Sequence, residues 1–149
     1  MACPFFDPQR RLEPGPWTHR PRLPLGDPYV GFCNSPSGPT HAPSEEHQRE
    51  LCNRGYARGL CEHFPVSSAA DAVRFSVVAE DRGGPLRVVY VFEKDHAPLS
   101  HGALEFQIAD FPAAEAAVPV DAPAGYLLLR QARAFVESYL MNRDLSAYP

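Results

Sequence analysis

The stretch VRFSVVAEDRGGPLRVVYVFE, residues 73–93, decides the fold of this 149-residue chain. Residues 73–80 alternate apolar and polar side chains, which is the pattern of a strand with one buried face. Residues 81–85 contain two glycines and a proline and are typical of a turn. Residues 86–93 are again rich in valine and aromatic side chains. The stretch therefore predicts an antiparallel β-hairpin.

The sequence after this hairpin predicts a third strand and a long helix. The third strand is expected at residues 103–108, after a polar loop at residues 94–102. Asp121 and Pro123 are typical of a helix start, and the helix should run to about Asn142. Its apolar face consists of Leu128, Ala132, Phe135, Val136, Tyr139 and Leu140. We expect a small antiparallel sheet with this amphipathic helix lying across it.

The composition changes near residue 65. Eleven of the 17 prolines occur at or before Pro65, and all four cysteines occur in the first 61 residues. We therefore expect one α+β domain, residues 1–149, with a Pro/Cys-rich region at 1–65 and the sheet and helix at 66–149. Proline disfavours regular structure, so the first region is predicted to be mostly loops, with one short helix from Ser44 through Cys52. Its many large apolar side chains predict an ordered arm wrapped on the rest of the chain.

The four cysteines follow the spacing C-x29-C-x18-C-x8-C, at Cys3, Cys33, Cys52 and Cys61. The first residues lack the basic and apolar segments of a signal peptide, so we expect a cytoplasmic, reducing location that disfavours disulfides. Four unrelated core thiols would rarely all avoid the apolar C-terminal half, which disfavours that interpretation as well. The favoured interpretation of the three is one metal centre that ties down the arm.

Two kinds of metal centre fit four thiolates. Structural zinc sites usually take two ligands from a tight C-x2–4-C turn, and this chain has none. A [4Fe–4S] cluster is wider, and each of its irons takes a thiolate from a separate direction. The dispersed spacing therefore favours a [4Fe–4S] cluster bound by Cys3, Cys33, Cys52 and Cys61, with Zn²⁺ as the alternative cofactor.

The segment between the last two cysteines has a composition suited to a cluster pocket. Gly55 and Gly59 would let the backbone approach the sulfurs, Tyr56 would exclude water, and Arg58 would offset negative charge. The competing interpretation is an ordinary turn with a solvated arginine. A mixed zinc site is the closest rival, in which His47, Cys52, Cys61 and His63 bind the ion. It would leave Cys3 and Cys33 without a role.

Other functional classes have weaker signals. The formal charge of −4 and the pI near 5.8 disfavour nucleic acid as a partner, although a basic stretch surrounds Trp17. No apolar run reaches the roughly 20 residues of a membrane span. Asp95, His96 and His101 invite a catalytic interpretation, but no nucleophile motif accompanies them. Lys94 is the one lysine among 14 basic residues, a bias typical of GC-rich bacterial codon usage.

These observations predict a small iron–sulfur protein that transfers electrons or senses redox state, together with a protein redox partner. The alternative is an interaction module in which zinc or an iron–sulfur cluster is purely structural. An enzyme is the third interpretation, because four protein ligands leave no open coordination position.

Overall fold

A computed structural model describes residues 2–12, 23–67, 70–81, 84–108 and 123–146. The structure contains two antiparallel sheets, a short helix and a long C-terminal helix. It therefore belongs to the α+β class that the sequence predicts. The predicted helix cap Asp121 and the basic stretch around Trp17 lie outside the described residues. In chain order the elements are β1 (Phe6–Arg11), β2 (Tyr29–Cys33), α1 (Glu45–His47), the π-helical turn η1 (Gln48–Cys52), β3 (Ala72–Glu80), β4 (Pro85–Lys94), β5 (Ala97–Gln107) and α2 (Pro123–Ser146).

The predicted hairpin is confirmed as β3 and β4, and β5 completes an antiparallel sheet of order β3-β4-β5. The predicted polar loop at residues 94–102 is wrong. A turn at Asp95 and His96, both with positive φ, joins the two strands, and β5 already begins at Ala97. The segment looks like a loop in sequence because β5 is an exposed edge strand, where polar side chains and Pro98 are tolerated.

The N-terminal region is more regular than the sequence predicts. β1 and β2 form a two-stranded antiparallel sheet, whose register shifts between Pro8 and Arg10. Proline lacks a backbone N–H, so a break in the ladder is where a strand accommodates it. The predicted short helix is present, but it continues as a π-helical turn and not as α-helix.

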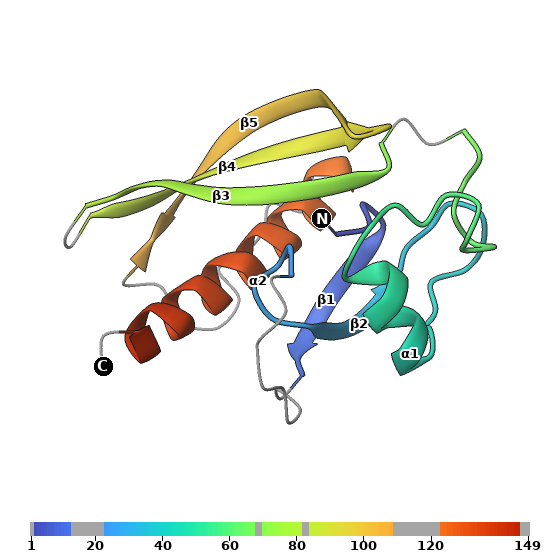
Figure 1. Cartoon of the computed structure of the whole chain (residues 1–149), viewed down its shortest axis with the longest axis horizontal. Helices are drawn as coiled ribbons and strands as arrows, with labels where there is room; N and C mark the ends of the chain where they lie inside the picture. Colours follow the sequence, from blue (N-terminus) through green and yellow to red (C-terminus); the bar gives the residue numbers. More distant parts are fainter. Residues whose placement is uncertain (1, 13–22, 68–69, 82–83, 109–122, 147–149) are drawn as a thin grey trace.

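Helix α2 packs against the three-stranded sheet on its apolar side (Figure 1). Phe135 of α2 stacks on Phe75 of β3, with ring centroids 5.7 Å apart. The Tyr139 hydroxyl donates to a carboxylate oxygen of Glu80 at 2.7 Å. The predicted apolar face is confirmed, since Ala132 and Val136 are buried in the hydrophobic core and four partly buried side chains of the face pack against it: Leu128, Phe135, Tyr139 and Leu140.

A second side of α2 holds the N-terminal arm; the sequence predicts that the arm wraps on the rest of the chain but does not indicate this helix as its partner. The buried Gln131 side chain donates from Nε2 to the carbonyls of Cys3, at 2.8 Å, and Phe6, at 2.7 Å. Arg130 donates to Asp7 at 2.9 Å. The Tyr29 hydroxyl donates to the carbonyl of Ala134 at 2.6 Å. The segment that carries Cys3 is therefore held to α2 by protein contacts.

The two composition regions share one core. Ala2 pairs with Val73 at the edge of β3 through backbone hydrogen bonds of 2.8 and 2.9 Å. Phe6 and Leu25 are buried in the same apolar cluster as Val88 of β4 and Val136 of α2. The arm is thus built into the sheet–helix layers.

The contact between Gln131 and the arm yields the first prediction. Gln131→Leu keeps most of the side-chain volume but leaves the carbonyls of Cys3 and Phe6 without their donor. We expect the free energy of unfolding to fall by about 2 kcal/mol, roughly 1 kcal/mol for each stranded carbonyl. Urea unfolding measures this. Gln107→Leu, at an exposed position of β5, is the control and should change stability little; equal effects of the two substitutions would refute the role of Gln131.

Candidate metal centre

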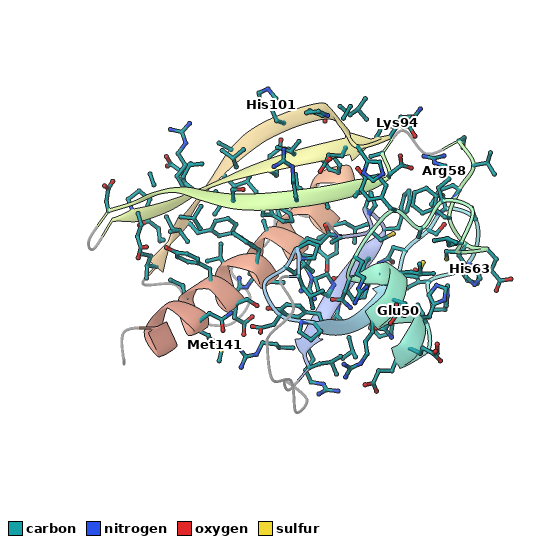
Figure 2. All side chains as sticks on the ribbon, viewed as in Figure 1. Glu50, Arg58, His63, Lys94, His101 and Met141 are labelled. Atoms are coloured by element: carbon teal, nitrogen blue, oxygen red, sulfur yellow. The ribbon has the colours of Figure 1, made fainter. Side chains whose placement is uncertain are left out.

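Four segments that are distant in sequence bring their cysteines to one cavity. Cys3 precedes β1, Cys33 ends β2, Cys52 ends η1 and Cys61 follows the next turn. The cavity has about 340 Å³ of empty space, part of it open to solvent. All four residues are free thiols; Cys3 and Cys52 are buried, and Cys33 and Cys61 are partly exposed. Figure 2 shows Arg58 and His63 at the α1 end of the molecule, with Met141 at the opposite end on α2.

The rest of the cavity wall is largely apolar. The rings of Phe5 and Phe64 meet edge to face, with centroids 5.6 Å apart. Together with Pro43, Leu51 and Ala57 they surround the thiols with hydrocarbon. On the buried side of the cavity, where Cys3 and Cys52 lie, such walls lower the local dielectric, which strengthens charge interactions there.

Burial controls the ionisation of the thiols. It raises the pKa of Cys3 and of Cys52 to about 12, and it also raises the pKa of Cys33. Electrostatic repulsion between the sulfurs also raises the pKa of Cys3, Cys33 and Cys52. Every pair among the four cysteines contributes to this repulsion, and Cys61 acts on each of the other three. Thiols with such pKa values stay protonated near neutral pH unless a cation replaces the protons. The thiols of Cys3, Cys33 and Cys52 would therefore ionise near neutral pH only beside a positively charged centre.

Two sulfurs also accept backbone hydrogen bonds. The N–H of Phe5 donates to the Cys3 sulfur and the N–H of Ser35 donates to the Cys33 sulfur, and each bond lowers the pKa of its thiol against the effect of burial. In both cases the donor lies two residues after the cysteine. Donors of this kind stabilise a metal-bound thiolate.

Backbone pairing fixes the ligand-bearing segments relative to one another. The N–H of Cys3 donates to the carbonyl of Cys52 at 3.0 Å. Cys33 and His41 exchange backbone hydrogen bonds of 2.8 and 3.3 Å. The N–H of Cys61 donates to the carbonyl of Ala57 at 2.8 Å and closes the last turn.

Two buried amides join η1 to β2. Gln48, at the start of η1, accepts from the N–H of Gly31 at 2.8 Å. Asn53, just after η1, accepts from the N–H of Tyr29 and donates to its carbonyl, both at 2.9 Å. The π-helical turn that ends at Cys52 is thus held at both ends, and π-helical turns are common at functional sites.

The glycines and tyrosine predicted to surround the cluster shape the turn that carries Cys61. Gly55 and Gly59 adopt positive φ, as does Tyr56 between them. The Tyr56 ring stacks on His96 with centroids 4.2 Å apart, and its hydroxyl donates to Glu93 at 3.3 Å. These contacts tie the turn to the β4–β5 end of the sheet.

Arg58 anchors the same turn. Its Nε donates to a carboxylate oxygen of Asp71 at 2.7 Å, and its guanidinium lies 5.1 Å from the centroid of the Phe64 ring. Within the described part of the chain, the residues of this turn that border the cavity are Ala57 and Cys61. An influence of Gly55, Tyr56, Arg58 and Gly59 on a bound metal stays a prediction.

Three imidazoles also border the cavity. His47 and His63 are the two that the mixed zinc hypothesis named, and His41 is a third, which the sequence analysis did not select. The Nε2 atom of His47 lies 3.3 Å from the Cys61 sulfur, and the rings of His41 and His63 pack with centroids 4.4 Å apart. His41 follows a loop with no metal-binding motif, so its backbone pairing with Cys33 had no signal in the sequence.

The other groups considered from sequence lie apart from this cavity. Asp95 and His96 form the β4–β5 turn, and His101 is exposed on β5.

Among the described residues, no set of three or more His, Cys, Asp or Glu side chains is grouped so as to hold a metal ion as the structure stands. No helix in the described ranges is long and apolar enough to cross a membrane. Comparison with protein families, curated proteins and solved structures finds no match to this chain.

Asp71 provides a pH-dependent test of the turn that carries Cys61. Its buried carboxylate accepts from the N–H of Asp95 at 2.9 Å and from Arg58, and these bonds lower the pKa of Asp71. A lowered pKa contributes stability above the ordinary aspartate pKa, and this contribution disappears as the pH falls through the lower value. At pH 7, Asp71→Asn should lower the free energy of unfolding by about 2 kcal/mol.

The deficit of Asp71→Asn should start to shrink near the ordinary aspartate pKa of about 4 and disappear only as the pH falls through the lowered value, where the carboxylate of the folded wild type becomes protonated. Urea unfolding at pH 7 and at a series of pH values down to about pH 2.5 measures it. Asp81→Asn, at an exposed position after β3, is the control and should have little effect at any pH of the series. A deficit for Asp71→Asn that is as large in acid as at pH 7 would contradict this assignment.

Proposed function

We propose that this chain binds one [4Fe–4S] cluster through Cys3, Cys33, Cys52 and Cys61 and works in electron transfer or redox sensing with a protein partner. The observation that carries the proposal is the meeting of all four cysteines of the chain at one cavity. Segments of 29, 18 and 8 residues separate them in sequence. Ordinary packing gives no reason for every cysteine of the chain to border the same cavity.

The cavity suits a cluster better than a single zinc ion. Four thiols that border one cavity from four separate segments could each bind a separate iron at a separate corner of a cluster. A zinc ion instead needs all of its sulfurs about 2.3 Å from one point. The apolar walls and the N–H groups of Phe5 and Ser35 provide the dry, hydrogen-bonded surroundings that set the potential of iron–sulfur centres.

The four cysteines differ in their exposure to solvent, which sets which side of a bound cluster would face the surface. Such a cluster, when bound, takes up and gives back one electron. The buried Cys3 and Cys52 hold their side of it away from water, and the partly exposed Cys33 and Cys61 bring the other side near the surface. A redox partner would therefore approach over Cys33 and Cys61.

Anaerobic purification followed by absorption spectroscopy tests this function. A cluster that works in electron transfer should give a brown protein whose broad visible absorption is bleached by dithionite and restored by mild oxidation. A brown protein that resists both reduction and reoxidation would reject the redox role and leave a structural cluster. A colourless protein with tightly bound zinc would reject the cluster itself.

One observation favours a second candidate, a structural zinc module. His47 and His63 border the same cavity as Cys52 and Cys61, so the four residues of a Cys2His2 zinc site all line it. This candidate predicts one zinc per chain and loss of zinc on substituting His63. The [4Fe–4S] proposal predicts that His63→Ala retains the metal, because His63 is not one of its ligands.

A further inference from the structure

Among the three imidazoles at the cavity, His47 stands out because it contacts a thiol. Its Nε2 atom lies 3.3 Å from the Cys61 sulfur, within hydrogen-bond distance for sulfur. The Nε2 atom of His63 instead faces Glu62 at 3.4 Å, and its ring packs on His41. These contacts single out His47 as the imidazole aimed at a proposed ligand.

The position of His47 depends on its backbone and on its neighbour. The N–H of His47 donates to the Ser44 hydroxyl at 3.2 Å, which caps α1. The next residue, Gln48, is buried and donates to the carbonyl of Pro43 at 2.6 Å while it accepts from Gly31 of β2. None of these bonds uses the imidazole, so the ring can be removed without removing what holds the segment.

A metal-bound thiolate carries no proton and can only accept a hydrogen bond. Facing such a sulfur, the Nε2 atom of His47 must carry the hydrogen and donate it. One-electron reduction of a cluster that is bound by thiolates adds negative charge to its sulfurs. A donor at one of them therefore stabilises the reduced form more than the oxidised form.

We infer that His47 donates a hydrogen bond to the Cys61 ligand of the cluster and thereby raises its reduction potential, acting through Cys61 as a positioning residue. This inference rests on the proposed [4Fe–4S] function. The electron comes from a low-potential electron-carrier protein and resides on the cluster iron; no bond to His47 forms or breaks. His47 sets how readily the centre accepts that electron.

The test compares His47→Ala with His47→Gln and His63→Ala, all purified anaerobically and titrated with dithionite in the presence of redox mediators. His47→Ala should keep the iron and sulfide content of the wild type. Its ratio of reduced to oxidised cluster at a fixed potential should fall about tenfold, equivalent to about 59 mV for one electron. The iron–thiolate stretch in resonance Raman spectra should move to higher frequency, since one sulfur has lost its donor.

The two other variants make the outcome decisive. His47→Gln carries an amide donor and should recover part of the potential, whereas His63→Ala should leave the potential unchanged. A loaded His47→Ala with the wild-type potential, or an equal shift in His63→Ala, would overturn the inference and leave the cluster in place. Loss of iron from both His47 variants would also overturn it, because His47 would then be needed to bind the metal. A wild-type chain without iron and sulfide would instead reject the underlying function.

Discussion

Cys52→Ser should give a folded chain that no longer holds iron. Cys52 lies where η1 ends and is buried in the wall of the cavity that the other three cysteines also border, so the substitution removes one of the four proposed ligands. We expect the iron content after anaerobic reconstitution to fall below about a tenth of the wild-type value. The fold should persist because Gln131, Gln48 and Asn53 hold the same segments through protein contacts.

Iron analysis combined with thermal unfolding checks both parts of this prediction. The loaded wild type should unfold at a higher temperature than Cys52→Ser, while the metal-free wild type and the variant should unfold within a few degrees of each other. Leu51→Ala removes more volume from the same cavity wall and should still retain iron. If Cys52→Ser held as much iron as the wild type, Cys52 would not be a ligand.

Gly31→Ala should be the most destabilising single substitution in the arm. A Cβ atom on Gly31 would lie 1.9 Å from the carbonyl oxygen of Asp7 and 2.9 Å from its carbonyl carbon, so β1 and β2 could not stay paired as they are. The clash is with backbone, which cannot rotate away as a side chain can. We expect the free energy of unfolding to fall by about 3 kcal/mol or more.

The consequence of Gly31→Ala should extend to the metal centre. β2 ends at Cys33, and β1 begins three residues after Cys3, so separating the strands should displace two of the four sulfurs. Gly38→Ala is a matched control, because nothing lies within 4 Å of the added Cβ atom there. In urea unfolding, Gly31→Ala should be less stable than Gly38→Ala. In iron-binding measurements, Gly31→Ala should also bind less iron than Gly38→Ala. A Gly31→Ala protein as stable as Gly38→Ala would contradict the close approach of the two strands.

The parts of the fold that sequence could predict are those governed by local periodicity. The alternation in residues 73–93 predicts the β3–β4 hairpin, and the helical spacing from Leu128 to Leu140 predicts the apolar side of α2. Long-range pairing has no such pattern. β1 contains Pro8, and a proline argues against a strand in sequence. The strand is possible because its register with β2 shifts just after Pro8, and this shift cannot be seen from the sequence. Gln131 has the sequence context of a surface residue, yet it is buried against the arm.

The same limit applies to the candidate site. Four cysteines in a chain with a cysteine-free C-terminal half were visible in the sequence, and the structure brings them to one cavity. Their surroundings were not predictable, because contacts between distant loops decide them. His41 borders the cavity because its backbone pairs with Cys33. By contrast, the Tyr56 side chain donates to Glu93, and the Arg58 side chain donates to Asp71.

Elemental analysis of the anaerobically purified chain tests the central claim most directly. If the four sulfurs of Cys3, Cys33, Cys52 and Cys61 enclose a cubane, each chain should contain about four irons and four acid-labile sulfides and no zinc. One zinc per chain without sulfide, or a chain that binds neither metal after reconstitution with iron and sulfide, would contradict it.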